Sequence, residues 1–217
     1  MTTRPFTYLL ITSLFVSVGC KKKETAAPAP SAPVTNPDEL TAETPEYVKY
    51  QLNGTSFSFT PPAQGTWFNG SGAPILQTGP PLNLANVYVS YYNNNTSVFT
   101  LSKSDSTRES GSNASNDLFK NMFVTGSYPY TTSYMEYNKR LGVSLTFKDS
   151  QNKIWTSENF NGKTFQSGSV FTISKSISYT KSSFQNIKIK SNFNCKVYNN
   201  NDSLQLTNGE VIISFFK

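Results

Sequence analysis

The side chains that carry most acid–base and nucleophilic chemistry in enzymes are sparse in this chain. Its 217 residues include no histidine, 13 aspartates and glutamates, and two cysteines. Without histidine, the Ser-His-Asp and Cys-His mechanisms and every zinc site built on imidazole are excluded. The sequence also has no phosphate-binding loop, no GxSxG nucleophile elbow and no CxxC pair. These residues leave open the hydrolysis of a glycosidic bond by two carboxylates.

Aspartate and glutamate are few in the part of the chain that follows residue 46. The eight positions are Asp105, Glu109, Asp117, Glu136, Asp149, Glu158, Asp202 and Glu210. Asp149, Asp202 and Glu210 stand in or beside predicted turns, where solvated carboxylates are ordinary, and their spacing identifies no catalytic pair. We therefore expect no catalytic residue, no metal and no cofactor, and we keep a carboxylate-based glycoside hydrolase as an alternative.

Cys20 stands at a position typical of lipid modification rather than of catalysis. Cys20 follows a 13-residue uncharged stretch, Phe6–Val18, that begins after Arg4 and is followed by Gly19. This is the layout of a secretory signal peptide, and the cysteine at its end makes residues 1–19 resemble a bacterial lipoprotein signal. The stretch is too short to cross a hydrocarbon core of ~30 Å. We expect cleavage before Cys20, lipidation of Cys20 and anchoring at the cell outer membrane, on its periplasmic or its external face. An ordinary cleaved signal is the alternative.

Residues 20–46 predict a tether. Lys21–Glu46 contains five of the twelve prolines and almost no large apolar side chains, so it cannot bury enough surface to fold on its own. We expect a disordered Pro/Ala-rich segment that holds the rest of the chain clear of the membrane. Residues 47–217 then carry 15 Lys and Arg against 8 Asp and Glu, a net charge of +7, which favours anionic surfaces as neighbours.

Apolar and polar residues alternate through much of the chain from Tyr47 onward. The clearest strand is 187–197, whose apolar face consists of Ile187, Ile189, Phe193, Cys195 and Val197. Its opposite face consists of Lys188, Lys190, Asn192, Asn194 and Lys196. Cys195 is therefore predicted to be a small buried apolar side chain rather than a redox centre. With Cys20 lipidated, no intramolecular disulfide is expected.

Turn and helix signals divide these strands. Asn53-Gly54 is a two-residue hairpin signal, and further Asn-Gly pairs stand at 69–70, 161–162 and 208–209. A short helix is expected near 115–124, with Ser115 as its cap and Gly126 as its end. Roughly nine or ten strands with turns at short intervals predict an all-β, antiparallel β-sandwich over residues 47–217, or less well a barrel. Two small domains divided near 102–116 are the alternative to one domain.

Aromatic side chains are the main indication of a ligand. The chain has 12 Tyr, 16 Phe and 2 Trp. Trp67 lies in a predicted loop, and Tyr88 and Tyr92 share one face of a predicted strand. Exposed rings on a sheet can stack on sugar rings, so these three residues are the candidate glycan-stacking residues. The alternative is that the rings fill the core or cover the open face of the sheet.

Four parts of the sequence are similar to those of a group of uncharacterised Bacteroidota lipoproteins. They are Gly19–Lys23, Tyr50–Gly54, Gly142–Ser157 and Phe193–Glu210. The first contains the lipidation motif, and the others are patterns of strands and turns. The resemblance implies an outer-membrane or surface lipoprotein with a β-sandwich domain and no assigned activity, and it brings no catalytic residues with it.

These observations predict a membrane-anchored, extracytoplasmic lipoprotein that binds rather than catalyses. A polysaccharide is the first ligand to consider. An envelope assembly or adhesion role, in which the domain meets a protein or an anionic surface glycan, is the alternative. The expected partners are the membrane through the lipid on Cys20 and a polysaccharide or envelope protein. Nucleic acid is not expected, because no binding module is recognisable and export separates the protein from it.

Overall fold

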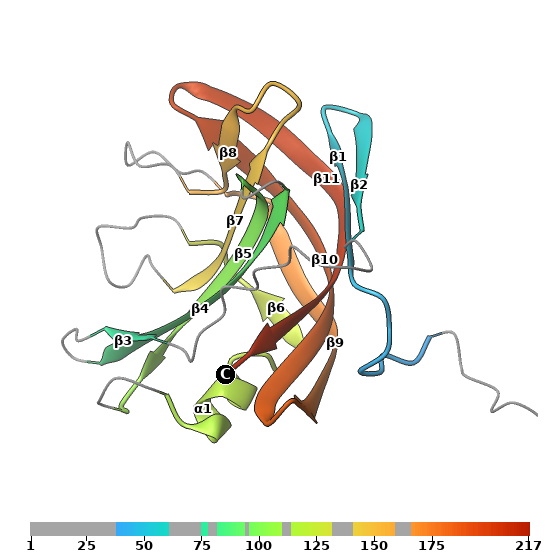
Figure 1. Ribbon diagram of the computed structural model, residues 1–217. Helices are drawn as coiled ribbons and strands as arrows, with labels where there is room; N and C mark the ends of the chain where they lie inside the picture. Colours follow the sequence, from blue (N-terminus) through green and yellow to red (C-terminus); the bar gives the residue numbers. More distant parts are fainter. Residues whose placement is uncertain are drawn as a thin grey trace, which may run out of the picture. The chain divides into compact units, whose positions relative to one another are not determined.

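Strands make up most of the described chain. The computed structural model describes residues 38–60, 75–77, 82–93, 96–109, 114–131, 141–158 and 166–217, with the backbone alone at 75–77, 92–93 and 96–98. Asp38–Lys217 forms one compact unit. The elements (Figure 1) are β1 (Tyr47–Leu52), β2 (Thr55–Phe59), β3 (Ile75–Gln77), β4 (Asn83–Asn93), β5 (Thr96–Thr107), α1 (Asn116–Asn121), β6 (Gly126–Tyr128), β7 (Gly142–Lys148), β8 (Ile154–Thr156), β9 (Val170–Lys181), β10 (Phe184–Asn199) and β11 (Asp202–Phe216).

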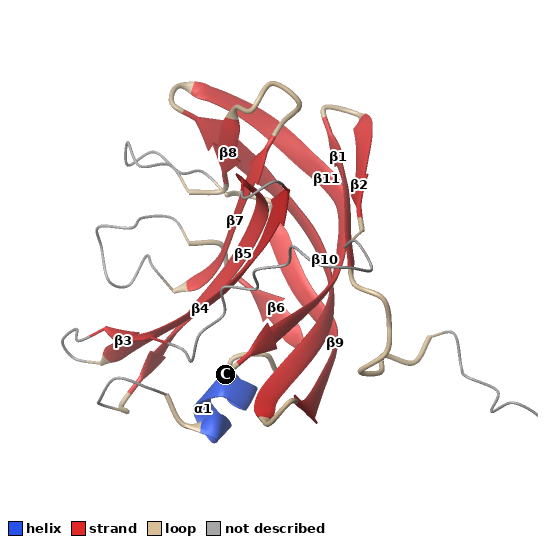
Figure 2. Ribbon diagram, viewed as in Figure 1, coloured by secondary structure: helices blue, strands red, loops and turns tan. Residues whose placement is uncertain are grey.

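Antiparallel ladders join the described strands into one 11-stranded sheet. The order is β2-β1-β11-β10-β8-β7-β5-β4-β3, and β10 is the point at which the sheet forks. Phe184–Asn194 of β10 pairs with β9, which pairs with β6, whereas Tyr198 pairs with Thr156 of β8. The predicted all-β antiparallel class is confirmed. Hydrogen bonds connect these strands into a single curved sheet, rather than into the two separate sheets of a typical sandwich (Figure 2).

A short parallel contact brings the two branches of the fork together again. The Val143 N–H donates to the Pro129 carbonyl at 2.9 Å, and the Thr131 N–H donates to the Val143 carbonyl at 2.9 Å. Gly142 permits this approach, because a Cβ atom there would lie 2.2 Å from the Pro129 oxygen and its φ is +122°. Tyr130 is thereby placed inside the fork, where its ring meets that of Phe171 edge to face.

The core lies against one face of the sheet. The alternation predicted for β10 is confirmed, since its apolar face is buried throughout. The main apolar residues that share this core with β10 are Val48, Leu52, Val87, Val89, Leu101, Val143, Leu145, Phe147, Phe171, Ile173, Leu206, Val211, Ile213 and Phe215. The opposite face of the sheet is called the outer face below.

The start of the helix α1 was predicted correctly, but its end was not. Ser115 caps it, and its hydroxyl accepts a hydrogen bond from the helix backbone at 3.0 Å. The helix ends at Asn121 rather than near residue 124, and the prediction that Gly126 ends it is wrong, since Gly126 begins β6. At the helix end the Phe123 N–H donates to the Lys120 carbonyl at 3.1 Å, three residues back, and the Phe123 ring enters the core, where its centroid lies 4.3 Å from that of Phe215.

Residues 38–46, which the sequence assigned to the tether, lie against the sheet and are called the N-terminal strap. Leu40 is only 7% exposed. The Lys188 ammonium, on the outer face of β10, donates to the backbone carbonyls of Ala42 and of Thr44, the second at 2.7 Å. The compact part of the chain therefore begins before the expected boundary at residue 47. The strap is held on the sheet by the buried Leu40 side chain, by the two carbonyls that accept from the Lys188 ammonium, and by Glu46, which accepts a hydrogen bond from the Tyr91 hydroxyl.

Candidate binding surface

The outer face of β2, β1, β11, β10 and β9 is lined with polar side chains that the strand register aligns. One row of cross-strand partners consists of Ser58, Lys49, Glu210, Asn192 and Thr172. A second row beside it consists of Ser56, Gln51, Asn208 and Asn194. We call these residues the polar strip. Because neighbouring strands lie about 4.8 Å apart, the strip presents amides and hydroxyls at regular intervals across five strands.

A β-bulge in β11 shapes the middle of the strip. The register of β11 shifts in its ladders with both β1 and β10. Asn208 adopts a φ of +51°, a conformation that asparagine tolerates better than most residues other than glycine. The Asn208-Gly209 pair thus forms a bulge inside a strand, whereas Asn53-Gly54, with φ values of +48° and +83°, forms the predicted hairpin. A bulge redirects side chains, and this one turns Asn208 toward β1.

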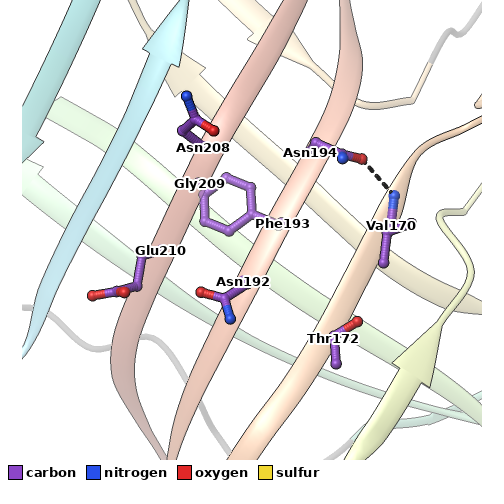
Figure 3. A pocket seen from close by; sticks show the side chains of 8 residues that line it. All are labelled: Val170, Thr172, Asn192, Phe193, Asn194, Asn208, Gly209 and Glu210. Atoms are coloured by element: carbon purple, nitrogen blue, oxygen red, sulfur yellow. Dashed lines mark hydrogen bonds between the residues drawn. The ribbon is translucent and has the colours of Figure 1, made fainter.

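A hollow of about 350 Å³ lies on the strip next to the bulge (Figure 3). It is lined by Val170, Thr172, Asn192, Phe193, Asn194, Asn208, Gly209 and Glu210. The Asn194 Oδ1 atom accepts a hydrogen bond from the Val170 N–H at 2.7 Å, drawn as a dashed line in Figure 3. This fixes the Asn194 amide and leaves its NH₂ group for a ligand. Within the described chain, the exposed Asn192 amide forms no side-chain hydrogen bond.

A second hollow, of about 310 Å³, continues the strip over β1 and β2. It is lined by Lys49, Tyr50, Gln51, Ser56, Phe57, Ser58 and Asn208. Asn208 belongs to both hollows, and its amide N–H donates to the Gln51 Oε1 atom at 2.8 Å. The two hollows are therefore adjacent parts of one surface.

The carboxylate of the strip is held by a tyrosine. The Tyr47 hydroxyl donates to the Glu210 Oε1 atom, and the Lys49 ammonium lies 4.3 Å from the centroid of the Tyr47 ring. Burial, and then the hydrogen bond to Glu210 and its negative charge, raise the pKa of Tyr47 to about 12. The tyrosine is therefore a hydrogen-bond donor at neutral pH, and it orients Glu210.

The strip is equipped to hold a ligand by hydrogen bonds. Among the described residues that line the two hollows, Glu210 is the only aspartate or glutamate, whereas glycosidic hydrolysis by the usual mechanism needs two carboxyl groups. No group of three or more Cys, Asp and Glu side chains that could hold a metal ion occurs in the described part of the chain.

The structure does not bring the candidate stacking residues to this strip. Tyr88 is 40% exposed on β4, and β8, β7 and β5 separate β4 from β10 in the sheet order. Tyr92 belongs to β4, but only its backbone is described. Trp67 and the lipidation candidate Cys20 lie outside the described residues.

The polar strip was not identified from the sequence. The polar face of the strand at 187–197 contained a signal, since it carries Asn192 and Asn194 between lysines. Its partners come from residues 49–58, 172 and 208–210, and only the register of four ladders shows that they are neighbours.

Cys195 occupies the core, as predicted. It is free, fully buried and hydrogen-bonded to the Tyr130 hydroxyl. Burial raises the pKa of its thiol to about 12, against the smaller opposite effect of Tyr130. A neutral thiol in an apolar site is a poor nucleophile, so Cys195 acts as a packing residue.

Comparisons with known proteins add no relative to this picture. No protein-family model, curated protein or solved structure matches the chain significantly. None of the helices in the described ranges is long and apolar enough to cross a membrane.

Proposed function

We propose that this protein is a non-enzymatic binding module of the cell envelope and that the polar strip binds a polysaccharide. The observation that carries the proposal is the register that places Gln51, Asn208 and Asn194 beside Glu210, Asn192 and Thr172 on one exposed face. The two adjacent hollows form one shallow groove on this face, along which an extended polysaccharide chain can lie.

The chemistry of the strip matches that of a sugar polymer. Each amide offers both donors and acceptors, and a carboxylate accepts several hydrogen bonds, so neighbouring hydroxyls of a sugar ring can be held in pairs. Val170, which is 44% exposed beside Asn194, offers an apolar contact for the C–H face of a ring. A binding role also fits the single carboxylate of the strip, Glu210, which the Tyr47 hydroxyl already engages.

The N-terminal sequence supports an envelope location. Residues 1–19 have the layout of a signal peptide and end immediately before Cys20, which we propose is lipidated and held in the outer membrane. Intact-mass analysis of the membrane-extracted protein is expected to show an N-terminal, lipid-modified Cys20, and Cys20→Ala is expected to release the protein from the membrane fraction. An unmodified N-terminus at another residue would contradict the anchor without affecting the strip.

The binding proposal is tested with Asn192→Ala and Asn194→Ala in the purified protein. Binding to a panel of soluble polysaccharides is measured by calorimetry, with product analysis of the same mixtures. We expect each variant to weaken binding by about fivefold to tenfold, the value of one or two lost hydrogen bonds, and no product to form.

Two controls locate the site. Asn121→Ala removes an exposed asparagine at the end of α1 and should leave binding unchanged. Tyr88→Ala removes the exposed ring on β4 and should also leave it unchanged. If Tyr88→Ala abolishes binding while the asparagine variants do not, the ligand lies on β4 and the strip is not the site. If a hydrolysis product forms and the replacement of one acid abolishes it, the protein is a hydrolase and the binding role is wrong.

A further inference from the structure

The polar strip is bordered by lysines that have no acidic partner among the described residues. On the outer face of β10, Lys190 and Lys196 flank Asn192 and Asn194. Lys175 of β9 stands directly opposite Lys190 in the β9–β10 ladder. Within the described residues, none of these three ammonium groups takes part in an ion pair.

The pair Lys175–Lys190 is unfavourable for the fold alone. Side chains directly opposite each other in an antiparallel ladder have Cβ atoms about 5 Å apart, and like charges at such positions are destabilising. A nearby acid would reduce this repulsion, yet within the described residues Glu210, in the adjacent row, forms no ion pair with either lysine. The acids of the strap, Glu43 and Glu46, act on Lys188 instead.

A negatively charged ligand would relieve this repulsion. An anionic group placed above the β9–β10 ladder would lie between Lys175 and Lys190, next to the hydroxyl of Thr172 and the amide of Asn192. Charge-assisted hydrogen bonds to ammonium groups are stronger than those between neutral groups. The positive charges of Lys175 and Lys190 and the amides of the strip would therefore act on the same ligand.

We propose that the polysaccharide bound by the polar strip is acidic and that Lys175 and Lys190 bind its anionic substituents. This inference rests on the proposed function, because it names the class of polymer that the same strip takes. The group recognised is an anionic substituent on a sugar ring, either a carboxylate or a sulfate ester.

The test compares charged and neutral forms of the same polymers. Binding of the purified protein is measured for polygalacturonate and its methyl ester, for dextran sulfate and dextran, and for polyglutamate as a polyanion without sugar. We expect polygalacturonate or dextran sulfate, whichever carries the recognised group, to bind at least about tenfold more tightly than its neutral form and than polyglutamate.

The variant Lys175→Ser/Lys190→Ser separates charge recognition from general sugar binding. It should weaken binding of the acidic polymer about tenfold and leave that of its neutral form within twofold, whereas Asn192→Ala should weaken both. Lys120→Ser/Lys148→Ser removes two lysines of α1 and β7, outside the strip, and should have little effect. Because the like-charge pair is lost, the first double variant should be as thermally stable as the wild type or more so.

The outcomes distinguish the two proposals. Equal binding of acidic and neutral polymers that Asn192→Ala weakens would overturn the acidic ligand and leave the polysaccharide site standing. Equal binding of polyglutamate would show attraction to any polyanion and would overturn the inference. Failure of every polymer in the panel to bind would overturn the proposed function together with it.

Discussion

The ring of Phe193 covers Gly209 across the β10–β11 ladder, so a Cβ atom at Gly209 would lie 2.4 Å from the ring and 2.6 Å from the Phe193 carbonyl oxygen. Gly209→Ala must therefore displace either the ring or the backbone of the bulge. We expect a loss of about 1–3 kcal/mol in the free energy of unfolding, measured by urea denaturation. Replacing the ring by the smaller leucine side chain, in Gly209→Ala/Phe193→Leu, should recover only part of the lost stability. The clash between the Cβ atom at position 209 and the carbonyl oxygen of residue 193 persists in this double variant. A Gly209→Ala variant as stable as the wild type would show that the contact is not restrictive.

The strap depends on Lys188, which is 3% exposed and donates to two strap carbonyls. Lys188→Met keeps the length of the side chain but removes the donor, so we expect a loss of about 1–3 kcal/mol, the range for hydrogen bonds from a charged group. Protease cleavage at Glu43 and Glu46 should accelerate in the native protein. Lys181→Met changes an exposed lysine of the same hairpin and should cleave like the wild type. Unchanged cleavage of Lys188→Met would mean that other contacts hold the strap.

Glu158 should make stability depend on pH. Burial raises its pKa, against a smaller opposing effect of the hydrogen bond with Ser144. The folded state therefore holds the proton more tightly than the unfolded state does, and its stability falls as pH rises from the unfolded pKa of about 4.3 through the higher folded pKa. We expect Glu158→Gln to match the wild type near pH 4 and to be the more stable protein at pH 7, in denaturation curves at both values. The opposite order at pH 7 would contradict this.

Cys195 should react only when the protein unfolds. With the pKa of its thiol raised to about 12 by burial, little thiolate exists at pH 8 and the reagent has no access. Alkylation followed by peptide mapping, which separates Cys195 from Cys20, is expected to find Cys195 unmodified in native protein and fully modified in denaturant. Rapid native labelling would place the Cys195 side chain on the exposed face of β10.

The sequence predicted the features that depend on neighbours along the chain. The two-residue period of 187–197 correctly separated the buried Cys195 from the exposed Asn192, because a strand places alternate side chains on opposite faces. Ser115 was correctly assigned as a helix cap for a similarly local reason. The end of α1 was missed: the helix ends at Asn121, and beyond it Phe123 packs against Phe215, a residue that lies far away in the sequence.

The polar strip could not be predicted because its members come together only through pairing. Lys49 and Glu210 are cross-strand partners, yet nothing in their local sequences indicates the β1–β11 ladder. Asn208-Gly209 has the composition of a hairpin turn. In the structure it forms a bulge instead, because β11 continues through it, paired with β1 on one side and β10 on the other, and the Phe193 ring packs over Gly209. The like-charge pair Lys175–Lys190 is equally invisible until the register is known.

The strap also determines where mechanical load enters the domain. Tension that reaches Asp38 along the preceding chain is taken first by Leu40 and by the two bonds from Lys188, and it passes into β10, which is paired with β11 along nearly its whole length. A second attachment follows at Glu46, which accepts a hydrogen bond from the Tyr91 hydroxyl at 2.9 Å. The β1–β2 hairpin begins only after these two points, so we expect a pull from the N-terminal side to load β10 and β4 before it reaches β1 and β2, two of the five strands that form the polar strip.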